Sequence, residues 1–302
     1  MRKLIITCDD CGLSEGINLA TLELYRKGLV ISPSVMMNFA AARHALDLFA
    51  AYPALEIGIH LNLTEGFPVV NTPSPSQLIR GDGRFRDRST LWYQALLAQP
   101  IFLEQAKIEL TAQMERFIQF GLRPAHITTH THFHLFPALC RVVEQLARDF
   151  SIPWIRAHRL QSTVLPFNPL FYAEKPLPKP RPASRAGLAP APSTSALAEK
   201  RLESEGTGER KAGDGGLSTA QRVPESGAPP AGTRPDFLIP IKYWLNRPPQ
   251  ELSQRLRALD GMIEIVVHPC TDQDDTFPPD TPYSPRQRYR EMLYLEHVMA
   301  QG

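Results

Sequence analysis

The chain has 302 residues, of which 43% are hydrophobic, and this is enough for the core of one large α/β domain or of two smaller ones. Its net charge is +2, from 33 basic and 31 acidic residues, so the composition offers no electrostatic argument for binding nucleic acid or an anionic membrane. No apolar run approaches the ~20 residues of a membrane-spanning helix, and the first ten residues lack the long apolar stretch of a signal peptide, so we expect a cytoplasmic protein.

Predicted strands and helices alternate along the first half of the chain. A short apolar strand begins at Lys3, and Ser14 is a candidate N-cap for a helix that ends at Gly28. Further strands are predicted at residues 29–37, 55–63, 125–133 and 152–157, and helices at 41–52, 101–120 and 137–149. This alternation favours a parallel sheet or barrel, in which functional residues gather at the carboxyl ends of the strands.

Residues 174–235 differ in composition from the rest of the chain. They include ten prolines and no aromatic residue, so they cannot bury enough apolar area to offset the entropy of ordering. We predict a disordered insertion in a single domain of residues 1–302, acting as a spacer or, alternatively, as a partner-binding arm. After it, a helix is predicted at 248–259, a strand at 262–268 and a final helix at 285–300.

The first strand ends on two acidic residues, Asp9 and Asp10, and Gly12 then allows a sharp turn. Adjacent side chains leave a strand in opposite directions, so the two carboxylates need not have the same role. One can bind a metal ion while the other reaches a water on that ion; the alternative is a carboxylate that caps the next helix. The flanking Cys8 and Cys11 are predicted to be free thiols, because neighbouring negative charge raises a thiol pKa.

Histidines mark the ends of the third and fourth predicted strands. His60 would be a satisfied core residue if taken alone, but the edge it shares with the two aspartates favours a ligand. His126, His130, His132 and His134 have even numbers, so on a continuous strand they would share one face. Four residues along a strand span about 13 Å, so one or two of them would bind a divalent metal and the others would orient ligands or contact substrate. The alternative is a polar strand unrelated to metal binding.

Two further strand ends carry polar residues. His268 ends the apolar strand at 262–268, and Pro269 forces a turn directly after it. With no other histidine near it in the sequence, His268 suits a proton donor better than a metal ligand. Arg156 ends the fifth strand, where it could contact substrate hydroxyls.

With these residues in view, the chain resembles the YdjC/ChbG-type carbohydrate deacetylases. The first strand of that family ends in A-D-D-F-G, and this chain has Cys8–Gly12 at that place. The family pattern G-x-H-x-x-L-T corresponds to Gly58–Thr64, and T-H-x-D-S-H-x-H-x-H-x-x-P corresponds to Ala125–Pro137. A late H-P pair matches His268–Pro269, and a D-G-x-F turn matches Asp82–Phe85.

The resemblance covers residues 3 to about 160 and resumes near residue 237. It implies a distorted, incomplete (β/α) barrel of the polysaccharide-deacetylase type. It also implies one divalent metal ion held by Asp10, His60 and His130. This ligand set suits Zn²⁺ or Mg²⁺, with Mn²⁺ and Fe²⁺ as further options. Asp9 would be the general base. The chain departs from the family at Thr128–Thr129, where the family has Asp-Ser, and at Cys11, where it has an aromatic residue.

The activity that this resemblance implies is removal of acetyl groups from N-acetylated sugars such as chito-oligosaccharides. His268 would protonate the leaving amine, while His132 and Arg156 would contact the sugar. Two alternatives stay open: a metal-dependent hydrolase of another bond, such as a phosphoester, and a non-catalytic protein that binds a metal or a sugar. The sequence leaves open the sugar, the native metal and the oligomeric state, including a homodimer.

Overall fold

The computed structural model describes residues 3–29, 32–70, 76–156, 235–279, 281 and 283–301. Contacts divide the chain into two units. The first comprises Met1–Lys179 and Gly227–Gly302 and contains every described residue, and the second comprises Pro180–Ser226. The predicted insertion at 174–235 lies outside the described residues except for Pro235, so it stays a prediction. Within the described part of the chain, no helix is long and apolar enough to cross a bilayer.

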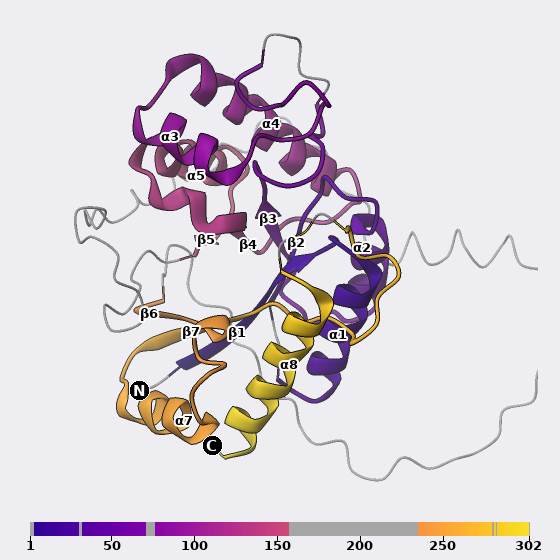
Figure 1. The fold of residues 1–302 in the computed structure, drawn as a ribbon, viewed down its shortest axis with the longest axis vertical. Helices are drawn as coiled ribbons and strands as arrows, with labels where there is room; N and C mark the ends of the chain where they lie inside the picture. Colours follow the sequence, from indigo (N-terminus) through magenta and orange to yellow (C-terminus); the bar gives the residue numbers. More distant parts are fainter. Residues whose placement is uncertain are drawn as a thin grey trace, which may run out of the picture. The chain divides into compact units, whose positions relative to one another are not determined.

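Seven parallel strands form one curled sheet in the order β5-β4-β3-β2-β1-β7-β6 (Figure 1). The chain begins near the middle of the sheet, builds outward to β5, and returns on the other side of β1 as β7 and β6. This half-barrel confirms the predicted distorted, incomplete (β/α) barrel. The strands are β1 (Lys3–Cys11), β2 (Ser32–Val35), β3 (Gly58–Leu61), β4 (His126–Thr129), β5 (Trp154–Ile155), β6 (Phe237–Pro240) and β7 (Met262–Val267).

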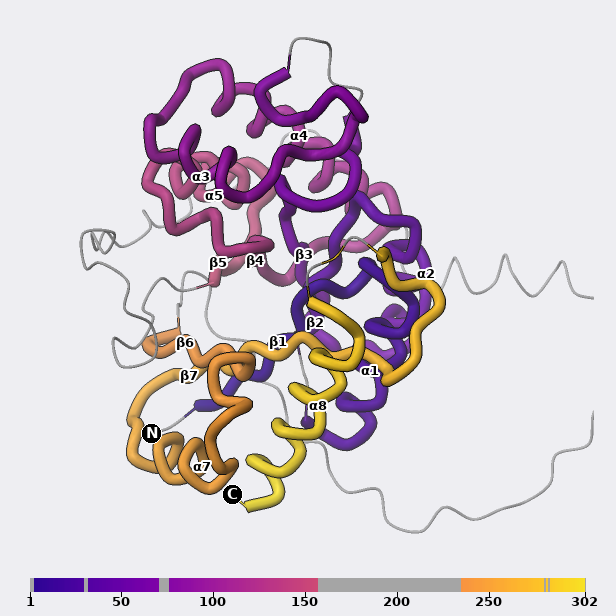
Figure 2. The backbone as a smooth tube through the Cα atoms, in the orientation of Figure 1, coloured from indigo at the N-terminus to yellow at the C-terminus, as the bar shows by residue number. Residues whose placement is uncertain are grey.

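Helices follow most of the strands, as the sequence predicts. They are α1 (Glu15–Arg26), α2 (Ala42–Ala50), α3 (Arg88–Leu96), α4 (Pro100–Ile118), α5 (Pro137–Asp149), α7 (Pro249–Ala258) and α8 (Pro285–Ala300). The group α3, α4 and α5 packs together beside β3–β5, whereas α7 packs on α8 and α8 on β7 (Figure 2). Ser14 caps α1 by accepting from the Ile17 backbone N–H, as predicted, and Ser284 begins α8 with a capping box. Helix α3 and strand β6 were not predicted.

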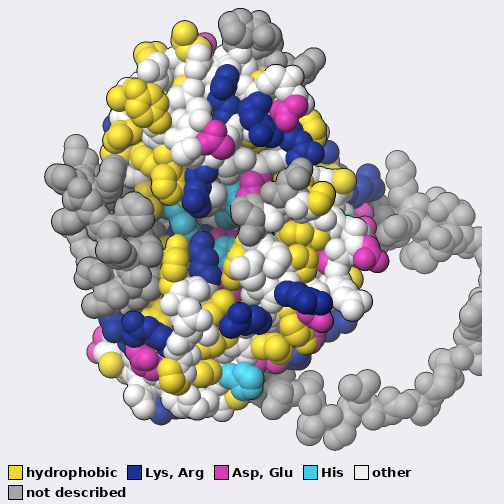
Figure 3. Space-filling model, in the orientation of Figure 1, with side chains coloured by type: hydrophobic (Ala, Val, Ile, Leu, Met, Phe, Trp, Pro, Cys, Tyr) yellow, Lys and Arg dark blue, Asp and Glu magenta, His cyan; other side chains and the backbone are white. Residues whose placement is uncertain are grey.

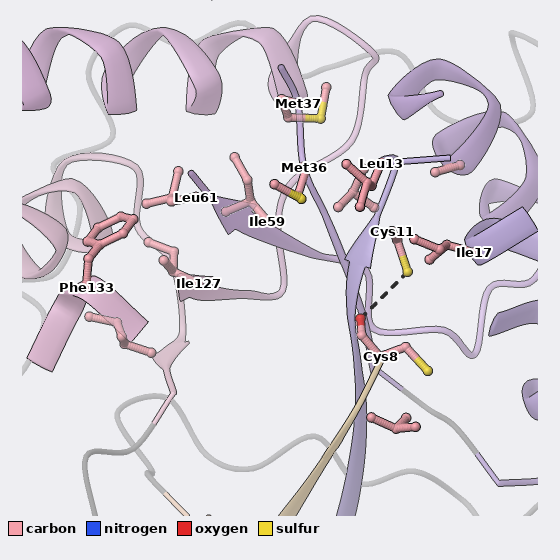
Figure 4. Packing of buried hydrophobic residues seen from close by; sticks show 14 of the residues in the cluster. Cys8, Cys11, Leu13, Ile17, Met36, Met37, Ile59, Leu61, Ile127 and Phe133 are labelled. Atoms are coloured by element: carbon pink, nitrogen blue, oxygen red, sulfur yellow. Dashed lines mark hydrogen bonds between the residues drawn. The ribbon is translucent and has the colours of Figure 1, made fainter. Parts of the chain in front are cut away.

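The two faces of the sheet differ in chemistry because side chains alternate along each strand. On the face that packs against the helices, Ile59, Leu61 and Ile127 join an apolar cluster with Met36 and Phe133 (Figure 4). The opposite face of β1, β2, β3, β4 and β7 carries buried polar residues: Thr7, Asp9, Ser32, Ser34, His60, His126, Thr128 and Glu264. A buried polar layer therefore lies inside the half-barrel, beneath the carboxyl ends of its strands.

The predicted strand at 125–133 is too long. β4 ends at Thr129, and residues His130–Leu135 form a short helical turn, η1, in which Thr131 and His132 both have φ of 55°. This left-handed backbone breaks the alternation of a strand, so the prediction that His126, His130, His132 and His134 share one face is wrong.

Candidate metal centre

Asp9 and Asp10 lie on an irregular stretch of β1. Cys8 pairs with Pro33 and Cys11 with Val35, so β1 has one residue more than β2 between these two points. Asp10 has a φ of 62°, which is rare for a residue with a side chain and common where a bulge re-aims a functional group. On a regular strand the two aspartates would point to opposite faces. The bulge instead lets both carboxylates approach β3, which lies on the far side of β2 from β1 in the sheet.

Three side chains from three separate elements converge at this edge of the sheet. Asp10 Oδ1 lies 3.1 Å from His60 Nε2 and 2.8 Å from His130 Nδ1. One ligand atom from each residue lies within 4.8 Å of the other two, and all three residues are buried. Histidine and acidic side chains are visible in the hollow at the centre of Figure 3, with basic side chains beside them.

Each of these three side chains is also held at its second polar atom. Thr128 Oγ1 lies 2.6 Å from His60 Nδ1, so the hydroxyl contacts the histidine at the position where the family pattern has an aspartate. Glu65 Oε1 lies 3.0 Å from His130 Nε2, and Arg288 Nη1 lies 2.8 Å from Asp10 Oδ2. Metal ligands in proteins are typically oriented by such partners. One carboxylate and two supported imidazoles fit a divalent ion.

The electrostatics of the centre follow from burial and from these partners. Burial raises the pKa of Asp10, but His130 and Arg288 outweigh it and hold that pKa well below its usual range. Burial lowers the pKa of His60 despite the nearby Asp9 and Asp10. For His130, burial acts in the same direction, but Asp10 and Glu65 prevail and raise its pKa to about 10. A metal ion at His130 would therefore displace a proton.

Asp9 is held by Arg156 rather than by Asp10, His60 or His130. Arg156 donates from Nη1 and Nη2 to the two carboxylate oxygens of Asp9 at 2.5 and 2.8 Å, and from Nε to Glu264 at 2.8 Å. All three side chains are fully buried. The expectation that Arg156 contacts substrate is wrong, because its donors face carboxylates beneath the site. Burial raises the pKa of Asp9, but Arg156 and His60 together hold it well below its usual range.

His268 lies just after β7, where the sequence predicts it, and is 8% exposed. Its Nδ1 lies 3.1 Å from Glu291 Oε2, and the same oxygen accepts from the His268 backbone N–H at 2.6 Å. The Tyr283 hydroxyl donates to the other oxygen of Glu291 at 2.5 Å. This anchoring leaves Nε2 as the ring nitrogen that can exchange a proton with a bound molecule.

The other histidines of the 126–134 segment separate into different environments. His126 lies inside the sheet, with Nε2 2.8 Å from Ser34 Oγ and its ring stacked on Trp154. His134 Nδ1 bonds to the Thr129 hydroxyl. His132 is half-buried, and burial together with the charge of Lys242 holds its pKa well below its usual range, so it is neutral.

Sequence reasoning missed four acidic or basic residues that support the site: Glu65, Glu264, Arg288 and Glu291. One signal was available, since Glu264 interrupts the otherwise apolar run of β7. Arg288 and Glu291 lie three residues apart on α8, where charged side chains are typical of a solvated helix face. The cysteine prediction holds, because Cys8 and Cys11 are free and buried. Burial, with Asp9 nearby, raises the pKa of Cys11 to about 12.

Comparisons with known proteins identify carbohydrate deacetylases among the relatives of this chain. A carbohydrate deacetylase of Geobacillus stearothermophilus is 41% identical over 179 residues, covering 57% of this chain and 69% of that protein. One of Brevibacillus brevis is 40% identical over 151 residues, covering 50% and 58%. A chitooligosaccharide deacetylase of Yersinia pestis is 36% identical over 184 residues, covering 57% and 70%. The matched region thus spans between 58% and 70% of the length of these three relatives.

A solved structure supports the fold. It is that of an Enterococcus faecalis V583 protein provisionally named a cellobiose-phosphate cleavage protein, with a TM-score of 0.64 and 22% identity, covering 99% of this chain and 93% of that one. The family model described as YdjC-like protein matches residues 3–301. Because that match takes in nearly the whole sequence, the chain belongs to the YdjC-like protein family.

Proposed function

We propose that this protein is a metal-dependent carbohydrate N-deacetylase, which hydrolyses the acetamide of an N-acetylated sugar such as a chito-oligosaccharide. The names of its relatives support the reaction class. The observation that carries the proposal is the convergence of Asp10, His60 and His130, with a separate carboxylate, Asp9, and an anchored histidine, His268, at the same sheet edge.

Asp10, His60 and His130 would hold the metal ion, with Zn²⁺ and Mg²⁺ as the leading candidates. A divalent ion bound there would acidify a water and polarise the acetyl carbonyl. Charge supports a cation at this place. Among the described residues around the centre, two guanidiniums (Arg156 and Arg288) are outnumbered by five carboxylates: Asp9, Asp10, Glu65, Glu264 and Glu291.

Asp9 would act as the general base that takes a proton from the attacking water. Its Oδ1 lies 3.9 Å from His60 Nδ1, the ring nitrogen that also contacts Thr128, so the carboxylate lies beside one of the metal-ligand candidates. Arg156 keeps Asp9 ionised at neutral pH and fixes its orientation through two hydrogen bonds. Each carboxylate oxygen can accept more than one hydrogen bond, so the contact with Arg156 leaves capacity for a water proton.

His268 would protonate the nitrogen of the departing amine. Glu291 fixes the imidazole through Nδ1, so that Nε2 would deliver the proton. An amine is a poor leaving group unless it is protonated, so this step is essential for an amide and less so for an ester. His132, neutral and half-buried, would contact the sugar.

The test is acetate release. The purified protein is stripped of metal, reloaded separately with Zn²⁺, Mg²⁺ and Mn²⁺, and incubated with N-acetylglucosamine, its oligomers and phosphorylated N-acetylated disaccharides. We expect acetate from at least one sugar in the presence of metal, and none from His60→Ala. A wild-type protein that holds stoichiometric metal but releases no acetate from any of these sugars would contradict the proposal.

A further inference from the structure

Arg288 is placed against the metal-ligand candidate Asp10 from the far end of the sequence. It lies in the first turn of α8, is 1% exposed, and contacts Asp10 Oδ2 through Nη1 at 2.8 Å. The opposite oxygen, Oδ1, is the one that faces His60 and His130. The two oxygens of Asp10 are therefore divided between two partners: Arg288 on one side and the imidazole pair on the other.

The guanidinium of Arg288 is fixed in this position by three further contacts. Its Nε donates to the Tyr283 carbonyl at 2.9 Å. Its central carbon lies 5.2 Å from the ring centre of Tyr283 and 5.5 Å from that of Phe277. A planar, permanently charged group held on two sides cannot easily move away from Oδ2. Glu291, one turn further along α8, meanwhile anchors His268.

We propose that Arg288 is a positioning residue that restricts Asp10 to binding a metal through Oδ1 alone. A carboxylate can bind a divalent ion through one oxygen or through both. Binding through both would fill a coordination position that a water or an acetyl oxygen needs. The purpose of that open position rests on the proposed function, but the coordination of the metal by Asp10 can be measured independently.

Arg288 also places a positive charge close to the expected cation, so it opposes metal binding. A residue present only to stabilise the metal would be expected to have the opposite charge. This predicts an unusual combination for Arg288→Met: a metal affinity that is equal or up to ~10-fold higher, with a kcat that is ~10- to 100-fold lower, within the range seen for residues that orient metal ligands.

The experiment replaces the native metal with Co²⁺ in the full-length protein. Visible absorption by Co²⁺ weakens as its coordination number increases, so weaker absorption reports that the second Asp10 oxygen has been added to the ligands of the metal. We expect weaker absorption in Arg288→Met than in wild type, with affinity measured by competition against a chromogenic chelator. Arg290→Met, at an exposed arginine on the same helix, is the matched control and should keep the wild-type spectrum and activity.

An unchanged Co²⁺ spectrum in Arg288→Met, or a loss of metal affinity of more than 10-fold, would overturn the proposal. If the Met variant does not fold, Arg288→Gln serves instead with the same expected spectrum, and Arg288→Lys should restore part of the wild-type absorption because it keeps the charge. If the wild-type protein deacetylates no sugar, the proposed function fails, but the spectra and affinities still decide the role of Arg288.

Discussion

The interior of the half-barrel and its carboxyl-terminal edge both contain buried histidines, but they place them in opposite environments. His126, inside the sheet, has the hydroxyls of Ser32 and Ser34 as partners, and burial lowers its pKa to about 3. His130, four residues later at the edge, lies between Asp10 and Glu65, which raise its pKa to about 10 against the effect of burial.

The comparison teaches that the partner, rather than burial, decides what a buried histidine does. Neutral hydroxyls satisfy His126 without stabilising its charge, so it acts as a packing residue beneath the site. The carboxylates of Asp10 and Glu65 would hold His130 in place for a bound cation, which would also interact with these carboxylates. We expect changes in the interior to alter stability, and changes at the edge to alter metal binding and catalysis.

The largest expected effect is loss of the metal centre. His130→Ala removes one of three ligand candidates, and we expect metal content to fall to background and activity to be lost, as in His60→Ala. His126→Gln should keep stoichiometric metal in the fraction that folds. Metal content is measured by elemental analysis after gel filtration. Full metal in His130→Ala, or its loss from folded His126→Gln, would break the comparison.

A smaller effect is expected at Asp9, which lies at the edge but is not assigned as a ligand. Asp9→Asn should keep metal affinity and reduce kcat by ~10²-fold or more, because the amide cannot accept a proton from water. His268→Ala should also keep metal, with a defect that shrinks on an activated ester because that leaving group needs no proton. Loss of metal from Asp9→Asn would show that Asp9 is a ligand.

The interior is tested at Gly58, which lies against His126. A β-carbon at Gly58 would lie 2.2 Å from His126 Nε2, and the ring is confined by Trp154 and the two serines. We expect Gly58→Ala to lower the free energy of unfolding by about 1–3 kcal/mol, the range for overpacking. Gly81→Ala, where an added β-carbon meets nothing within 4 Å, is the control. Equal chemical-denaturation midpoints for the two variants would refute the packing role.

The smallest effect is the pH dependence that His126 imposes on stability. Its pKa of about 3 in the fold lies below the unfolded value of 6.5, so the stability it contributes is present above pH 6.5 and is lost as pH falls towards 3. At pH 5.5 the loss from this residue is about 1.4 kcal/mol. The free energy of unfolding, measured by urea denaturation across pH 5–8, should therefore change less steeply with pH in His126→Gln than in wild type. An equal dependence of the unfolding free energy on pH in the two proteins would mean that His126 is not held neutral.

The sequence by itself determined that polar residues gather near the carboxyl ends of the strands. The alternation of strands and helices predicts a parallel barrel-like sheet, and the carboxyl ends of parallel strands meet at one edge. Asp10, His60 and His268 could therefore be placed together although up to 258 positions separate them. The cap at Ser14 is equally local, because it depends on a hydroxyl and a backbone N–H three residues away.

Only the tertiary structure decided how these residues are supported and where strands are interrupted. Arg156 appeared to be a substrate contact because periodicity does not reveal that Glu264 and Asp9 lie beside it, 108 and 147 positions away in the sequence. The left-handed backbone at Asp10 and at Thr131 cannot be read from residue type, since only a few per cent of residues with a side chain adopt it. The partners on α8, Arg288 and Glu291, reach the site because the last helix packs on β7, a contact that no local pattern encodes.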